Sequence, residues 1–177
     1  FCSGRDLKAL ATGLSDEEAA RMGEDPDLHW TALLRHFRPS KPIIAAVEGY
    51  CVAGGTEILQ ATEIRVAGES AQLGIAEVRR GLFPLGGSTV RLQRQIAFTN
   101  AADLLLTGRL ISATEAKEIG LIGHVVPDGQ ALAKARELAD QIAANGPLAV
   151  AAVLKSMRET AGMTEADGLA RELEIGE

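Results

Sequence analysis

The fold is decided by a stretch of small residues, EGYCVAGGTE at positions 48–57. Before it lies the apolar run PIIAAV (42–47), which predicts a strand covered on both faces. After it, TEILQA (56–61) predicts the first turns of a helix. Glycine lets a ligand approach the backbone closely, and the first N–H groups of a helix lack partners and carry partial positive charge. This junction is therefore suited to holding a negatively charged oxygen.

Two glutamates accompany the junction. Glu57 stands in the first turn of the expected helix, and Glu77 follows a short expected strand at 71–74. Two carboxylates that share a site rarely ionise independently, so that one can act as an acid while the other acts as a base. The alternatives are a plain glycine turn and two unrelated surface glutamates, with Glu57 favoured only by the helix dipole.

Five motifs then follow in order along the chain: FCSGRDL (1–7), GGTE (54–57), AQLGIAE (71–77), GLFPLGG (81–87) and LTGRLISATEA (106–116). Together they resemble the enoyl-CoA hydratase/isomerase family, also called the crotonase superfamily, from Phe1 to at least Pro127. The resemblance implies an α/β fold, a spiral of β-β-α units with a helical C-terminal region. It implies a core at 1–127 and helices at 128–177. Because the family has further strands and helices, we expect missing strands before Phe1 and a truncated C-terminal region.

The resemblance also implies the chemistry. It points to enoyl-CoA hydratase activity, a hydro-lyase reaction of fatty-acid β-oxidation on an acyl-CoA substrate, without a metal or a separate cofactor because CoA is part of the substrate. The N–H groups of Arg5 and Gly54 would form an oxyanion hole for the thioester oxygen. Glu57 would take a proton from water attacking Cβ, and Glu77 would deliver one to Cα. The implied substrate-binding residues are Ser3, Lys8 and Leu85.

Two residues depart from the family pattern, and the alternatives follow from them. Arg5 replaces a small residue, which keeps the N–H but directs a bulky side chain away from the thioester. Leu85 replaces a glycine near the attacking water and adds an isobutyl group. Double-bond isomerisation, which can run with one carboxylate, another crotonase-type reaction, or a non-catalytic acyl-CoA binder therefore remain alternatives. A serine hydrolase is excluded because no serine has a nucleophile-elbow context. Lys8 is either a contact to a CoA phosphate or a solvated surface lysine.

Composition further narrows the class of protein to which the chain can belong. The 177 residues fit one domain, with 46% hydrophobic and 24% charged residues. A net charge of −6 argues against a general nucleic-acid binder, and no apolar run reaches the length of a membrane span. Cys2 and Cys51 predict reduced thiols in a cytoplasmic protein. We interpret His29, His36 and His124 as structural, since no partner at ligand spacing supports a metal site.

The remaining pattern is helical. Ser15 and Glu18 form a capping-box pattern, and apolar residues from Trp30 to Phe37 predict a helix over residues 28–37. Asp128 is expected to cap a long amphipathic helix. In the resembling family the last helices contact neighbouring subunits, which implies a homotrimer or a dimer of trimers. Three arginines are assigned no catalytic role and are expected to meet surface acids or other subunits: Arg79, Arg80 and Arg91.

Overall fold

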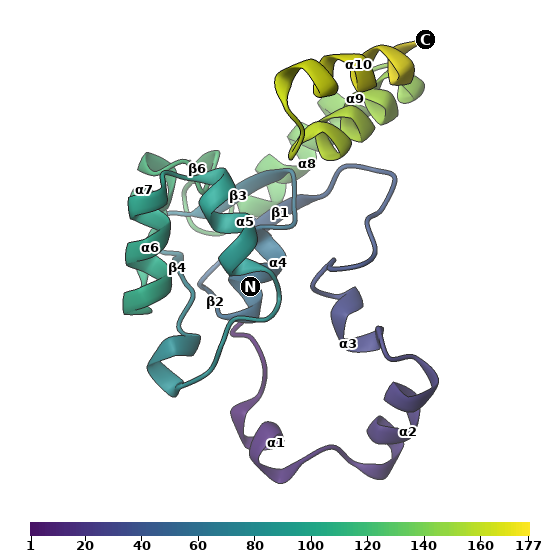
Figure 1. Ribbon diagram of the computed structural model, residues 1–177. Coiled ribbons are helices and arrows are strands. Elements are labelled where there is room, and N and C mark those ends of the chain that lie inside the picture. Colours follow the sequence, from purple (N-terminus) through teal and green to yellow (C-terminus); the bar gives the residue numbers. More distant parts are fainter.

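The computed structural model describes residues 1–177, except for the side chains of residues 9 and 10. The first helices lie away from the sheets, at the purple end of the ribbon (Figure 1). They are α1 (Leu7–Thr12), α2 (Asp16–Glu24) and α3 (Leu28–Thr31). The expected capping box of α2 is confirmed, because the Ser15 hydroxyl accepts from the Glu18 N–H while the Glu18 carboxylate accepts from the Ser15 N–H.

Two β-β-α units follow. The first is β1 (Ile44–Val47), β2 (Tyr50–Val52) and α4 (Gly54–Leu59). The second is β3 (Ile64–Gly68), β4 (Gln72–Gly74), the 3-10 helix η1 (Glu77–Arg80) and α5 (Ser88–Gln95). The order confirms the predicted α/β spiral of β-β-α units.

Each unit contributes one strand to each of two sheets. In the first sheet β1 and β3 run parallel, with Ala46 opposite Val66. In the second, β2 and β4 run parallel, with Cys51 opposite Leu73. The chain passes from β1 to β2 through Gly49, whose φ of +62° favours glycine. This sharp bend places the end of β2, and hence the start of α4, at a defined point beside the second sheet.

The rest of the chain completes both sheets and adds the C-terminal helices. Antiparallel β5 (Ile111–Ser112) joins β4, and parallel β6 (His124–Val126) joins β3. The elements are α6 (Phe98–Thr107), β5 (Ile111–Ser112), α7 (Ala113–Glu118), β6 (His124–Val126), α8 (Ala131–Ala143), α9 (Pro147–Thr160) and α10 (Glu165–Gly176). Helix α8 packs on β1 and β3, whereas α9 and α10 pack on each other and project from the sheets (Figure 1).

The first residues of the chain form a further strand position beside β2. The Cys2 N–H donates to the Tyr50 carbonyl oxygen and the Val52 N–H donates to the Cys2 carbonyl oxygen, both across 3.0 Å. Cys2 thereby forms a parallel bridge with Cys51. The turn that follows this strand position therefore lies beside the end of β2.

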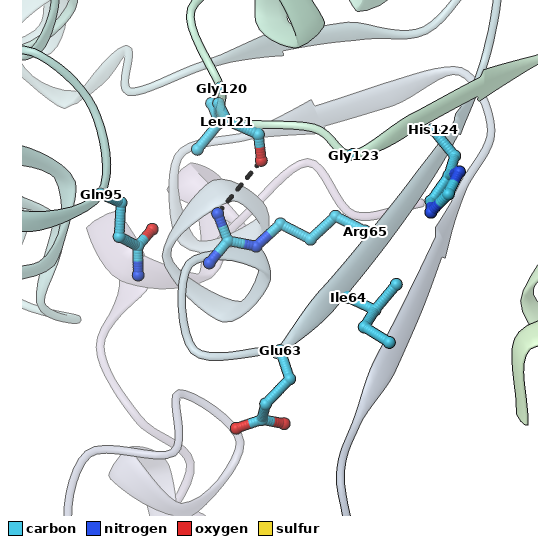
Figure 2. A pocket seen from close by; sticks show the side chains of 8 residues that line it. All are labelled: Glu63, Ile64, Arg65, Gln95, Gly120, Leu121, Gly123 and His124. Atoms are coloured by element: carbon cyan, nitrogen blue, oxygen red, sulfur yellow. Dashed lines mark hydrogen bonds between the residues drawn. The ribbon is translucent and has the colours of Figure 1, made fainter. Parts of the chain in front are cut away.

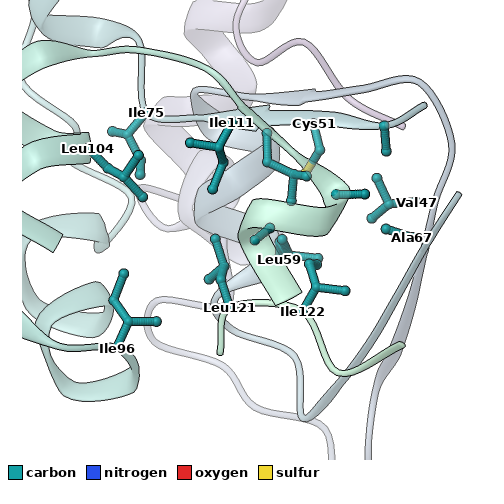
Figure 3. Close-up of a cluster of buried hydrophobic side chains, with 14 of the residues drawn as sticks. Val47, Cys51, Leu59, Ala67, Ile75, Ile96, Leu104, Ile111, Leu121 and Ile122 are labelled. Atoms are coloured by element: carbon teal, nitrogen blue, oxygen red, sulfur yellow. The ribbon is translucent and has the colours of Figure 1, made fainter. Parts of the chain in front are cut away.

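Aliphatic side chains from strands of both sheets and from the helices around them make the core (Figure 3). Leu59 of α4, Leu73 of β4 and Leu92 of α5 are fully buried in it. A smaller cluster around Val66 lies beneath α8. Because α4 and α5 are both anchored in the main core, their N-terminal ends are held rigidly at the edge of the sheets. None of the helices in the described part of the chain combines the length and apolar character that a membrane span requires.

Two helix predictions are wrong. The helix expected over 28–37 ends at Thr31, and Leu34 has a φ of +50°, which interrupts a helix. The carbonyl oxygens of Leu33 and Leu34 accept from the distant Arg91 guanidinium, at 3.0 and 2.8 Å. This tertiary contact stabilises a turn where local apolar spacing predicted a helix.

Asp128 does not cap α8, whose N-cap residue is Gln130. The Asp128 carboxylate instead accepts from the Ser70 N–H at 2.9 Å. The Glu48 carboxylate accepts from the Ala131 N–H at 3.0 Å and so satisfies a first-turn donor of α8. The acid that serves this helix start lies 83 residues earlier in the chain, so a local capping rule cannot find it.

Candidate active site

The turn after the first strand lies directly against the start of α4. Gly4 has a φ of +86°, and a Cβ built on it would lie 2.9 Å from the Ala53 Cβ and 3.0 Å from the Gly54 nitrogen. Ala53, the N-cap of α4, also has positive φ, at +51°, a strained conformation for alanine. Neither the Gly54 N–H nor the N–H of Arg5, the residue after Gly4, has an acceptor among the described residues.

The start of α4 is fixed to its surroundings by close packing and by a buried hydroxyl. A Cβ on Gly55 would lie 2.3 Å from the Cys2 carbonyl oxygen, so only glycine fits there. The Thr56 hydroxyl lies 2.6 Å from the Cys51 carbonyl oxygen and 2.9 Å from that of Gly74. Strand, turn and helix start are therefore held as one unit.

Glu57 follows in the first turn of α4 and is only 4% exposed. Its Oε1 accepts from the Ser88 N–H at the start of α5, at 3.2 Å. A Cβ on Gly86 would lie 2.3 Å from its Oε2, so the turn before α5 fits closely around the carboxylate. Burial raises the pKa of Glu57, while the N–H groups of Ser88 and Gly86 and the charge of Arg91 oppose the rise.

Glu77 begins η1 and is half-buried. Its Oε2 is buried and has no hydrogen-bond partner in the described part of the chain. Burial, with a further contribution from the charge of Glu57, raises the pKa of Glu77 to about 7. The two predicted carboxylates thus interact electrostatically, and an unpaired buried oxygen is free to exchange a proton with a ligand.

The other predicted residues lie at the surface. Ser3, Arg5 and Lys8 are exposed. The Lys8 N–H donates to the Asp6 carboxylate at the start of α1, and within the described residues no hydrogen bond or ion pair joins Lys8 to the other predicted site residues.

Leu85 lies in the turn before α5, with its side chain 55% exposed. Its carbonyl oxygen accepts from the Arg35 guanidinium, which lies 5.0 Å above the centre of the Trp30 ring. The segment after α3 therefore lies against the turn before α5, which is the turn that fits closely around the Glu57 carboxylate.

The amino-acid sequence profile of the enoyl-CoA hydratase/isomerase family matches residues 1–176. The chain belongs to this family.

Relatives and solved structures agree with the family assignment. The chain is 60% identical to "Enoyl-CoA hydratase EchA19" of Mycobacterium tuberculosis, over 99% of this chain and 66% of the relative. It is 34% identical to "2,3-dehydroadipyl-CoA hydratase" of Escherichia coli, over 99% of this chain and 66% of the relative. The crystal structure of the Bacillus anthracis enoyl-CoA hydratase superposes with a TM-score of 0.85 at 37% identity, over 99% of this chain and 66% of that chain. The chain thus spans just under two thirds of the length of these relatives.

Three features of this hydratase/isomerase family member were missed by sequence reasoning. The turn at 86–88 holds the Glu57 carboxylate, which comes from 31 residues before Ser88 in the chain. Arg91, which was expected to meet surface acids or other subunits, donates to backbone carbonyl oxygens. No sequence pattern pointed to Arg35. An arginine one helical turn after a glycine pair was the available clue for Arg91.

A pocket at the N-terminal end of β3 contains none of the predicted site residues (Figure 2). It is lined by Arg65, Gln95 and His124, among others. The Arg65 guanidinium donates to the carbonyl oxygens of Leu121, Gln60 and Thr62, each at 3.1 Å. Because these bonds tie β3 to neighbouring segments, we interpret Arg65 as structural.

Proposed function

We propose that this chain is the catalytic part of an enoyl-CoA hydratase, which adds water across the double bond of a 2-enoyl-CoA to give a 3-hydroxyacyl-CoA. The observation that carries the proposal is the place of Glu57, which is buried in the first turn of α4, three residues after Gly54, whose N–H has no acceptor among the described residues. Burial and the charge of Glu57 both raise the pKa of Glu77. The names of the relatives support it, since EchA19 and the Escherichia coli relative are both hydratases.

The reaction follows from the positions of these groups. The N–H groups of Arg5 and Gly54 hold the thioester oxygen and stabilise the negative charge that develops there. This polarises the double bond, so that the oxygen of water bonds to Cβ. Glu57 takes a proton from that water and Glu77 delivers one to Cα. After the addition, Glu57 carries a proton and Glu77 has lost one. Proton exchange then returns both glutamates to their starting protonation states, so that the net reaction adds one water to the double bond.

The two glutamates are suited to different roles. Two backbone N–H groups face the Glu57 carboxylate and favour its ionised form, as a base requires. Glu77 has a pKa of about 7 and an unpaired Oε2, so a large fraction carries a proton near neutral pH, as an acid requires. Their different surroundings therefore suit Glu57 to the role of base and Glu77 to the role of acid.

The remaining expectations belong to the same proposal. Ser3, Lys8 and Leu85 contact the acyl-CoA, which is the only group the reaction needs besides water. Residues 1–127 form the catalytic core and 128–177 a helical region of a cytoplasmic homotrimer or dimer of trimers. Support for assembly comes from α9 and α10, which project from the sheets and expose Leu148 at 85% and Leu173 at 64% (Figure 1).

Double-bond isomerisation is the second candidate. Leu85 favours it, because this residue directly precedes Gly86, whose built Cβ would lie 2.3 Å from Glu57 Oε2, and we expect an isobutyl group there to leave less room for an attacking water. Isomerisation moves a proton between two carbons of the acyl chain and needs no water.

One assay separates the candidates. The full-length protein is given crotonyl-CoA, and the loss of the enoyl absorbance and the formation of 3-hydroxybutyryl-CoA are followed. Hydration confirms the proposal. Turnover of a 3-enoyl-CoA without hydration identifies an isomerase, and binding of acyl-CoA without turnover of either substrate identifies a binder.

A further inference from the structure

Arg91 of α5 contacts three separate segments through backbone carbonyl oxygens. Its Nη1 lies 3.0 Å from the Leu33 oxygen, 3.4 Å from the Glu57 oxygen and 3.3 Å from the Gly86 oxygen. Its Nη2 lies 2.8 Å from the Leu34 oxygen. These segments are the turn after α3, the first turn of α4 and the turn before α5. One side chain therefore cross-links the groups that surround the proposed base.

The guanidinium group is needed for this arrangement. Its donors lie in a rigid planar fork, whereas a lysine ammonium is a single point of charge. Gly87 has a φ of +120°, and a Cβ there would lie 3.1 Å from both Cζ and Nε of Arg91. The glycine pair before α5 thus makes room twice, at Gly86 for the Glu57 carboxylate and at Gly87 for the guanidinium.

Arg91 forms no ion pair with a carboxylate among the described residues. Its hydrogen bonds instead fix the backbone of Glu57 and the turn whose Ser88 N–H holds the Glu57 carboxylate. We infer that Arg91 is a positioning residue for Glu57, acting through the α4 backbone and the turn before α5. This inference rests on the proposed function, because it concerns the base of that reaction.

The charge of Arg91 supports the same role. The charged groups that act on Glu57 and Arg91 are each other, Glu77, Arg38 and Arg35. Arg91 lowers the pKa of Glu57, against the effect of burial. Removing the charge should therefore raise the pKa of Glu57 and move the acid limb of the pH–rate profile to higher pH.

The kinetic test uses three variants of the full-length protein. Arg91→Met removes charge and fork, Arg91→Lys keeps the charge, and Arg94→Met changes an exposed arginine of the same helix. With crotonyl-CoA we expect Arg91→Met to lower kcat about tenfold to a hundredfold with little change in KM, and to shift the acid limb upward. Arg91→Lys should restore the acid limb but not kcat, and Arg94→Met should match the parent. An Arg91→Met variant with parental kcat and acid limb overturns the inference.

A second measurement does not depend on turnover. Carboxyl ¹³C NMR gives the pKa of Glu57, and amide hydrogen exchange gives the protection of the Ser88 N–H. We expect a higher Glu57 pKa in Arg91→Met, and faster Ser88 exchange in both Arg91 variants than in Arg94→Met. If Arg91→Met does not fold, Ser88 exchange in Arg91→Lys decides. Unchanged exchange overturns the inference, whereas a parent protein that hydrates no enoyl-CoA overturns only the proposed function.

Discussion

The Ser88 N–H donates to Glu57 Oε1 across 3.2 Å, which joins the starts of two helices that belong to successive β-β-α units. The carboxylate leaves the first turn of α4 and ends at the N-terminus of α5, where backbone N–H groups lack helical partners. A glutamate that is only 4% exposed thereby keeps hydrogen bonds to its ionised form. This bond favours the ionised form of a buried carboxylate, which the proposed role of Glu57 as a base requires.

Replacing the acid should stop the reaction without preventing binding. In Glu77→Gln we expect kcat for crotonyl-CoA to fall about a hundredfold to ten-thousandfold, because the amide cannot deliver a proton to Cα. Calorimetric titration with a CoA ester should give a dissociation constant close to that of the parent. Glu118→Gln, an exposed change on α7, is the control. Turnover retained in Glu77→Gln would remove Glu77 from the mechanism.

Glu77 should also make stability depend on pH. Its folded-state pKa of about 7 lies above the ordinary value of 4.5, so its contribution to stability is fully present below pH 4.5 and is lost as the pH rises through about 7. Because the side chain is only half-buried, we discount for solvent screening and expect a loss of about 1–2 kcal/mol. Urea unfolding at about pH 5 and about pH 8 measures it. Glu77→Gln should lose less stability over this interval, and identical pH dependence in both proteins would contradict the prediction.

The oxyanion arrangement should not tolerate a methyl group at Gly4. In Gly4→Ala the new Cβ would meet Ala53 and the Gly54 nitrogen at 2.9 and 3.0 Å, which forces the two turns apart. We expect kcat to fall about a hundredfold to a thousandfold. Gly13→Ala is a matched control, since Gly13 has a similar φ of +82° but no atom within 4 Å of its built Cβ. Equal kcat values for the two variants would show that the close approach of the turns has no catalytic consequence.

The C-terminal helices should depend on Arg158 of α9. Its guanidinium donates to the Pro39 carbonyl oxygen at 2.6 Å and to the Glu63 carboxylate at 2.7 Å, with side chains 22% and 17% exposed for Arg158 and Glu63. Arg158→Ala removes the guanidinium that pairs with the partly buried Glu63 carboxylate. We therefore expect the free energy of unfolding, measured in urea, to fall by about 2 kcal/mol. Arg171→Ala, which removes an arginine that pairs only within α9 and α10, should leave the midpoint nearly unchanged. Equal losses would mean that the contact does not anchor α9.

Sequence predicted the parts of this molecule that depend on near neighbours. The capping box of Ser15 and Glu18 uses partners three residues apart, and it is found as expected. Strands were predicted at 42–47 and 71–74, where β1 (Ile44–Val47) and β4 (Gln72–Gly74) are found. Strand β2 (Tyr50–Val52) was missed, because it lies within the small-residue stretch that was interpreted as a turn.

What sequence could not supply were contacts between distant segments. The turn at Leu34 depends on Arg91, 57 residues away, and the N–H of Ala131 depends on Glu48, 83 residues away. The candidate site shows the same difference between local and distant contacts. Glu57 was predicted from its glycine turn, but Ser88, whose N–H donates to its carboxylate, belongs to the next β-β-α unit.

The central claim is that two backbone N–H groups and two carboxylates face one acyl-CoA thioester. A crystal structure of the full-length protein with butyryl-CoA, a saturated thioester that cannot be hydrated, tests it most directly. We predict that the thioester oxygen lies about 3 Å from the nitrogens of Arg5 and Gly54, with Glu57 and Glu77 facing the Cα–Cβ bond. A thioester oxygen bound elsewhere, or a glutamate directed away from the acyl chain, would contradict the account.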